Sequence, residues 1–237
     1  MADAPRRRLP DHAISANFRP RHDALHAPDP MILTPIAPHA LDLVMAAFER
    51  ALGGAPLETA VFRRIAASRA AEGGPADRWH ADAVALADRF AMRPLAEAPQ
   101  QAFSWDGVRV RTESEPAVLV HEVAHYQIAA PARRFLPDFG LGAGPETGLT
   151  DIADAARAAD AQTRETEEAM ASLLGILWEV ELGQPAILAF QEQNWLEGAG
   201  RPGTADFFRA TLGRLGDIGL IDRDGRPTYA VRISPAL

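Results

Sequence analysis

Cysteine and lysine are both absent from this chain of 237 residues. Without cysteine there can be no disulfide, no thiolate metal site and no cysteine nucleophile, so any bound metal must be held by His, Asp or Glu. Arginine is the only strongly basic side chain, and together with the abundant alanine this indicates a compositional bias of the source genome rather than a function.

The chain also lacks an excess of positive charge and any long apolar run. Its 24 arginines stand against 32 acidic residues, for a formal net charge of −8, whereas a nucleic-acid-binding protein is expected to carry a basic face. No segment approaches the roughly 20 apolar residues that span a bilayer, and no apolar stretch follows Arg6, Arg7 and Arg8 to make a signal peptide. We therefore expect a cytoplasmic protein that binds neither nucleic acid nor a membrane.

The distribution of proline predicts a flexible leader followed by one domain. Residues 1–38 are rich in proline and show little periodicity, as is typical of a flexible segment. Residues 39–237 are long enough for a single domain with a sizeable core. The expected fold class is mainly α (α+β), a helical metal-binding domain with short β-hairpins.

Apolar residues at helical spacing place the expected elements. Helices are predicted over residues 41–52, 57–71, 76–91, 115–129, 151–182, 186–197 and 204–215. Asp106 with Gly107, and Asp224 with Gly225, predict the turns of two short hairpins. His80, on the third helix, is predicted to be a structural residue with a hydrogen-bond partner.

The chemistry of the chain is concentrated in the pattern H-E-x-x-H at His121, Glu122 and His125. Residues four apart lie on one face of a helix, so the two imidazoles can bind one metal ion. Glu122 can reach a water in the first shell of that metal, which is the position of the general base in helical metallopeptidases. Two histidines of an ordinary amphipathic helix would give the same letters, but the uncharged flanks disfavour this, because a buried histidine pair is costly unless it is coordinated or paired.

A third metal ligand is predicted on the acidic helix after Asp160. Glu165 and Glu168 are three residues apart and share a face. Glu168 is the predicted ligand because it leads into the apolar run 169–177 and should point inward, with Glu165 in a supporting role. A solvated acidic stripe is the alternative interpretation.

The residues after the motif helix are rich in breakers, and the loop 136–145 is predicted to be either a wall or lid of the site or an ordinary connector. Arg133 and Arg134 precede it. Their planar guanidinium groups suit an acidic substrate group, or they pair with Asp138 and hold the loop. The structural pairing with Asp138 is favoured.

The segment HEVAHYQIAAPARRFLPDFG resembles the bacterial elongation factor P hydroxylase family, whose members carry a similar H-E-x-x-H followed by Ile-Ala, Ala-Arg-Arg, Leu and Asp-Phe-Gly. A second block, D-A-Q-T at residues 160–163 followed by Glu165 and Glu168, resembles the D-A-Q-T run and E-x-x-E of the family. The resemblance covers residues 115–185. This chain differs from the family by an insertion at residues 147–159 and by Leu-Gly-Ala at 141–143.

The resemblance implies a non-haem metal hydroxylase that uses molecular oxygen on a modified lysine of elongation factor P or another protein substrate. Two histidines and one carboxylate would then bind Fe(II). A zinc metallopeptidase with Glu122 as general base remains an alternative, as does a metal-stabilised interaction protein without turnover. Fe(II) and Zn(II) both accept these ligands, so the sequence favours Fe(II) only through the resemblance.

Overall fold

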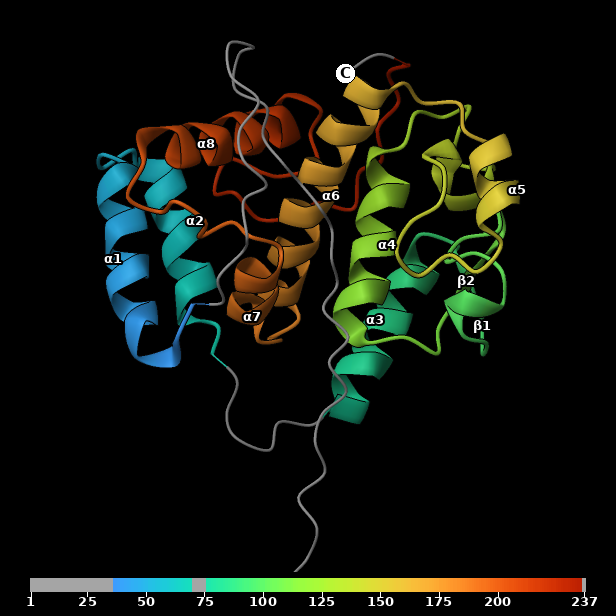
Figure 1. The fold of residues 1–237 in the computed structure, drawn as a ribbon, viewed down its shortest axis with the longest axis horizontal. Coiled ribbons are helices and arrows are strands. Elements are labelled where there is room, and N and C mark those ends of the chain that lie inside the picture. The colour runs from blue at the N-terminus through green and yellow to red at the C-terminus, as the bar shows by residue number, and fades with distance from the viewer. Residues whose placement is uncertain (1–35, 70–75, 236–237) are drawn as a thin grey trace, which may run out of the picture.

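The computed structural model describes residues 36–69 and 76–235. Most of the predicted leader therefore lies outside the described residues, and Ile36 already packs against the core. The described ranges are mainly helical with one small parallel sheet, which confirms the predicted fold class (Figure 1). The elements are α1 (Leu41–Ala51), α2 (Pro56–Ala67), α3 (Ala76–Arg89), β1 (Arg93–Leu95), β2 (Arg109–Arg111), α4 (Pro116–Ile128), α5 (Thr150–Ala155), α6 (Ala161–Glu181), α7 (Ala186–Glu192) and α8 (Pro202–Asp217), with short 3-10 turns at Pro38–Ala40, Pro99–Gln101 and Pro137–Gly140.

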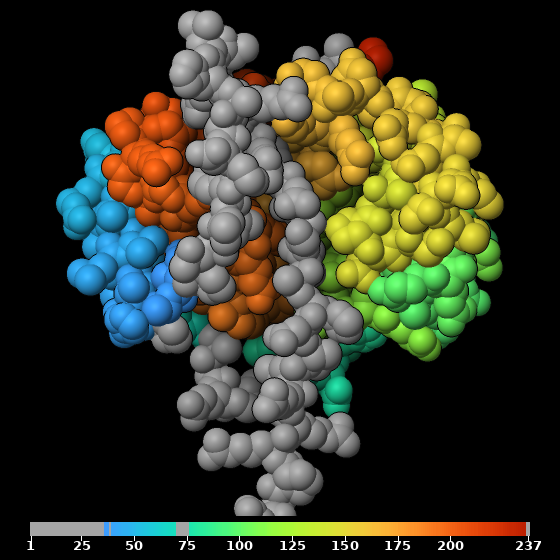
Figure 2. Space-filling model, in the orientation of Figure 1, coloured from blue at the N-terminus to red at the C-terminus, as the bar shows by residue number. Residues whose placement is uncertain are grey.

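Helix α6 is the centre of the fold. Figure 1 shows it between a group formed by α1, α2, α7 and α8 and a second group formed by α3, α4 and the sheet, and it packs directly on α4, α7, α8 and α2. The space-filling view shows the same two sides, with α1 and α8 on the left and the segment around α5 on the right (Figure 2). Almost every residue from Ala169 to Glu179 is buried, so α6 contributes core side chains to both groups.

The backbones of α4 and α6 lie close together at one glycine. A Cβ atom added to Gly175 of α6 would lie 3.4 Å from the Cα atom of His121 on α4. Glycine therefore lets the two helix backbones approach each other at the level of the H-E-x-x-H motif.

The start of α6 is fixed by an N-cap. The Asp160 carboxylate accepts a hydrogen bond of 2.7 Å from the Thr163 backbone N–H.

Both predicted turns form, but each predicted hairpin is reduced to a single antiparallel bridge. At the Asp106–Gly107 turn the bridge joins Trp105 and Val110, and β2 forms its longer pairing in parallel with β1, which the sequence does not predict. The three residues of β1 are too few to leave a periodic signal in the sequence.

At the carboxyl end, one antiparallel bridge between Ile221 and Pro227 closes the turn at Asp224 and Gly225. The side-chain amide of Gln127 donates to the carbonyl groups of Thr228 and Ala230, so α4 holds the segment that follows this turn.

Several predicted helix ends also need correction. The helix expected over 151–182 is two helices, α5 and α6, because the chain turns at 156–160 and restarts at the Asp160 cap. Helix α7 ends at Glu192 rather than at residue 197. It cannot continue further because Asn194 has a φ of 65°, which a right-handed helix does not allow. Helix α2 ends at Ala67, and the last predicted positions, 70 and 71, lie outside the described residues. Within the described ranges, no helix combines the length and hydropathy that crossing a membrane requires.

Glu179 is an ionisable side chain buried within α6. Burial, together with the nearby Glu192 carboxylate, raises the pKa of Glu179 from its ordinary value of 4.5 to about 8. Between these two pH values the folded protein keeps a proton that the unfolded chain has released. The free energy of unfolding should therefore fall as the pH rises through this window.

We expect Glu179→Gln to flatten this pH dependence and to raise the free energy of unfolding at pH 7.5 by about 1 kcal/mol or more. Urea denaturation at several pH values between 4.5 and 8 measures it. Glu181→Gln is the matched control, since Glu181 forms a surface ion pair with Arg226. Equal slopes in Glu179→Gln and the parent protein would contradict a buried neutral Glu179.

Candidate metal centre

The structure brings the three predicted metal ligands together. His121 and His125 lie one turn apart on α4, and Glu168 reaches the same point from α6. The Oε2 atom of Glu168 lies 3.7 Å from Nε2 of His121 and 3.4 Å from Nε2 of His125. One ligand atom from each residue falls within 4.8 Å of the others. The inward direction predicted for Glu168 is thus confirmed as a position beside both imidazoles.

The separations of these atoms suit a shared metal ion. Ligand atoms that are each about 2.1 Å from one tetrahedral ion lie about 3.4 Å apart. The Nε2 atoms of His121 and His125 lie beside the Glu168 carboxylate rather than beside a backbone carbonyl. His80 is the contrast, because its Nε2 atom lies 2.6 Å from the carbonyl oxygen of Thr112, in accord with its predicted structural role. The group therefore fits a divalent cation.

Charge is divided unequally within the group. Burial and the neighbouring His125 lower the pKa of His121. Burial alone would lower the pKa of His125, but the neighbouring Glu168 carboxylate outweighs it and raises this pKa to about 9. Burial alone would raise the pKa of Glu168, but the two histidines outweigh it and lower this pKa. In the metal-free protein His125 and Glu168 form an ion pair, so a cation must displace a proton to bind.

Glu122 lines the same pocket as the three ligands without belonging to the metal-binding group. Burial raises the pKa of Glu122 to about 8, and the negative charges of Asp138 and Glu168 add to the effect. The Ser104 hydroxyl forms a hydrogen bond with this carboxyl group and favours its charged form. Glu122 is therefore placed as a proton-holding group beside the metal centre.

The loop after α4 forms one wall of the pocket, as one of its two predicted interpretations requires. Residues 138–147 provide about half of the lining. The Phe139 ring stacks on the imidazole of His125, with centroids 5.6 Å apart, and on Trp105, with centroids 5.8 Å apart. The wall thus restricts the orientation of a ligand histidine as well as closing the pocket.

The backbone of this wall is strained. Asp138 and Phe139 have φ values of 41° and 57°, which residues other than glycine rarely adopt and which cost free energy. The Asp138 carboxylate accepts hydrogen bonds from the Trp105 backbone N–H at 3.1 Å and from the Thr147 hydroxyl at 2.6 Å. These bonds hold the strained turn in place. Thr147 is the first residue of the insertion at 147–159, by which this chain differs from the elongation factor P hydroxylases that it resembles.

The predicted pairing of Arg133 and Arg134 with Asp138 is wrong. Arg133 instead forms a buried ion pair with Glu167 and donates to the Phe139 carbonyl at 2.9 Å. Arg134 donates to backbone carbonyl groups, those of Tyr126 and Arg232. Among the described residues that line the pocket there is no arginine, so the contacts of both side chains are structural.

Sequence reasoning missed four polar pocket residues, Ser104, Glu146, Thr147 and Gln193. Each lies outside the H-E-x-x-H motif, and no spacing connects it to the motif. Glu165, in contrast, was singled out as a supporting residue but does not line the pocket, although it is half-buried on α6. The ion pairs of the buried Glu167 with Arg133 and Arg232 are not predictable from local spacing, because both arginines lie far from it in sequence.

Comparisons with protein-family models, with curated proteins and with solved structures find no match for this chain. The resemblance to elongation factor P hydroxylases therefore rests on the motif residues themselves.

The first prediction for this site concerns Glu168. Glu168→Ala should lower the affinity for Zn(II) or Co(II) at least about 100-fold, as should His121→Ala, because each removes a ligand rather than a supporting group. Equilibrium dialysis with metal analysis measures the affinity. Glu165→Ala is the matched control and should keep most of the metal. Full metal retention in Glu168→Ala would exclude Glu168 as a ligand.

The second prediction concerns the buried charges behind the site. Arg133→Ala leaves Glu167, which is 1% exposed, with Arg232 as its remaining ion-pair partner. We expect a loss of about 3 kcal/mol in the free energy of unfolding. Arg63→Ala, which breaks an exposed pair with Glu49, should cost less than about 1 kcal/mol in the same denaturation experiment. Similar losses in the two variants would refute a structural role for Arg133.

Proposed function

We propose that this protein is a metal-dependent hydroxylase that adds oxygen to a modified lysine of a protein substrate, with elongation factor P as the first candidate. The observation that carries the proposal is the convergence of His121, His125 and Glu168 in a chain without cysteine. Two histidines and one carboxylate are the ligand set of non-haem iron oxygenases. A bound Fe(II) would supply the activation of molecular oxygen.

The size and lining of the pocket support a substrate that inserts a single side chain. The cavity has a volume of about 80 Å³, and much of its wall is apolar, with Val118, Phe139, Leu141 and Pro145 among its residues. The side chains of His121 and Glu168 remain 21% and 31% exposed, so the centre can be reached from solvent. Neither β1 nor β2 contributes a lining residue, so no strand among the described residues lines the pocket in a position to pair with an extended peptide.

The residues of the chain take distinct roles in this proposal. His121, His125 and Glu168 would hold the metal, and Phe139 fixes the His125 ring by stacking. Glu122 holds or releases a proton at its carboxyl oxygen, and Ser104 orients that carboxyl group.

A zinc metallopeptidase is the second candidate, and the position of Glu122 favours it. This carboxyl group follows the first ligand directly and lines the same pocket, as the general base of such an enzyme must. The same ligand set also suits a metal-stabilised interaction protein without turnover.

The deciding experiment is anaerobic purification, metal analysis and reconstitution with Fe(II). With an added two-electron reductant such as ascorbate, which reduces the second oxygen atom to water, the reconstituted protein should consume oxygen in the presence of lysine-modified elongation factor P. Mass spectrometry should find one added oxygen atom on the modified lysine. Glu168→Ala should abolish both signals, and Glu165→Ala should retain them. Bound zinc without oxygen consumption would overturn the proposal.

Glu122→Gln separates the two enzymatic candidates. In a hydroxylase we expect the metal to stay bound and oxygen consumption to continue at a reduced rate, because Glu122 supports the site without holding the metal. In a peptidase the metal also stays bound, but hydrolysis is lost with the general base. Cleavage of casein by the parent protein, lost in Glu122→Gln, would favour the peptidase and reject the hydroxylase.

A further inference from the structure

Gln193 brings an unpaired polar atom to the metal pocket from a separate part of the chain. It follows α7 as the C-cap residue and lines the cavity that holds His121, His125 and Glu168. Its side-chain oxygen Oε1 is buried and has no hydrogen-bond partner among the described residues. A buried carbonyl without a partner is unfavourable, so such a group at a cavity wall indicates that a ligand supplies the donor.

The segment that carries Gln193 is anchored on both sides. Its backbone N–H donates to the Ala189 carbonyl at 2.9 Å. Two residues later the indole N–H of Trp195 donates to the Ser172 hydroxyl at 2.7 Å, and Ser172 lies one turn after Glu168 on α6. These bonds hold the segment against the helix that carries the third ligand.

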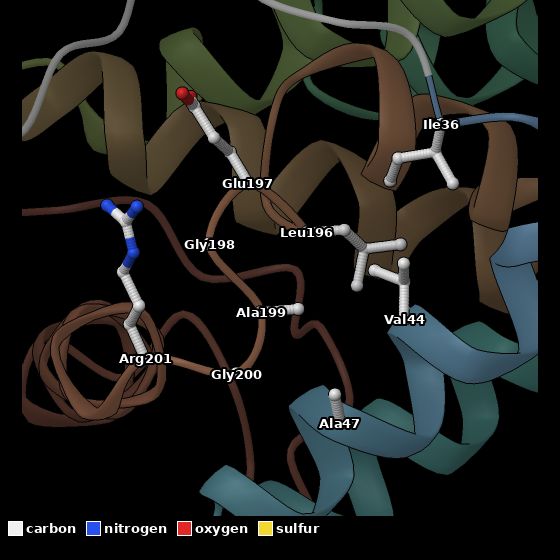
Figure 3. Close-up of a pocket in the computed structure, with 9 residues that line it drawn as sticks. All are labelled: Ile36, Val44, Ala47, Leu196, Glu197, Gly198, Ala199, Gly200 and Arg201. Carbon is white, nitrogen blue, oxygen red and sulfur yellow. The ribbon is translucent and has the colours of Figure 1, made fainter.

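The next part of the segment is held by α1. Figure 3 shows Leu196 and Val44 pointing toward one another across a separate hollow, while Glu197 and Arg201 point away from it. That hollow is lined mainly by small and aliphatic residues, and none of its described lining residues belongs to the metal-binding group. Gln193 is thus fixed in place by its neighbours, and its side chain remains available to the metal pocket.

We propose that Gln193 is a substrate-binding residue whose side-chain carbonyl accepts a hydrogen bond from an N–H group of the substrate next to the metal centre. The proposal rests on the proposed function in that it takes the metal pocket as the substrate site. In a cavity of about 80 Å³ a molecule bound at the centre also touches the walls. The substrate class is therefore one with an amide or amine N–H close to the group that approaches the metal.

Two small chelators that differ by one N–H group test this. Acetohydroxamate binds a metal through its oxygen atoms and keeps an N–H, whereas N-methylacetohydroxamate has none. Calorimetric titration of the Co(II)-loaded protein gives the affinity ratio of the two. Gln193→Leu, which removes the acceptor at similar volume, should shift this ratio about fivefold against acetohydroxamate. Gln193→Glu, which keeps an acceptor, should preserve it.

Gln191→Leu is the matched control, because Gln191 bonds to the Ile187 carbonyl of its own helix at 3.1 Å and does not line the pocket. Its ratio, metal affinity and melting temperature should equal those of the parent protein. An identical ratio in the parent and in Gln193→Leu, with Co(II) bound to both, would overturn the role of Gln193 alone. If the affinity ratio of the two hydroxamates depends on Gln193 but the Fe(II)-loaded protein consumes no oxygen, the hydroxylase proposal is overturned while the substrate-binding role of Gln193 stands. A parent protein that binds no Co(II) would overturn both.

Discussion

The close approach of α4 and α6 at Gly175 is the constraint on which the metal-binding group depends. Both histidines stand on one helix and the carboxylate on the other, so their separation is set by how near the two backbones lie. Gly175 allows that approach next to His121, and Glu168 lies two turns earlier on the same helix. A Cβ atom at position 175 would already be in contact with His121, so a side chain larger than alanine would separate the helices just where the ligands must converge.

Two adjacent glutamates of α6 give this interface its two different electrostatic environments. Glu167 is buried against Arg133 and Arg232, whereas Glu168 faces the two histidines. Neighbouring residues on a helix are turned by roughly 100° from each other, so fixing Glu167 with two cations also fixes the direction of Glu168. Arg232 lies in the carboxyl-terminal segment, which α4 holds through Gln127, and this distant segment therefore stabilises the helix that carries the carboxylate.

The parts of the site that sequence could predict are those set by local spacing. His121 and His125 follow from helical periodicity, and Glu168 follows from its place at the start of an apolar run. Arg133 was assigned the wrong partner because proximity in sequence favoured Asp138, while tertiary packing supplied Glu167. The parallel pairing of β1 with β2 was not predicted for the same reason, since an intervening loop separates the two strands in sequence. Only the packed chain brings Gln193 to the pocket.

Strain and unpaired polar atoms gather around one cavity, and this concentration separates a binding site from ordinary packing. Of the buried side-chain atoms that lack a partner in the described ranges, those of His121 and Gln193 belong to the pocket lining, and the third, on Thr59, does not. Positive φ angles outside glycine occur in those ranges at Asp138 and Phe139 in the wall, at Asn194 next to Gln193, and at Ala91. Each feature costs free energy. Chance packing has no reason to place most of them beside the group of described residues that can hold a metal, whereas a site that gains hydrogen bonds on binding a ligand does.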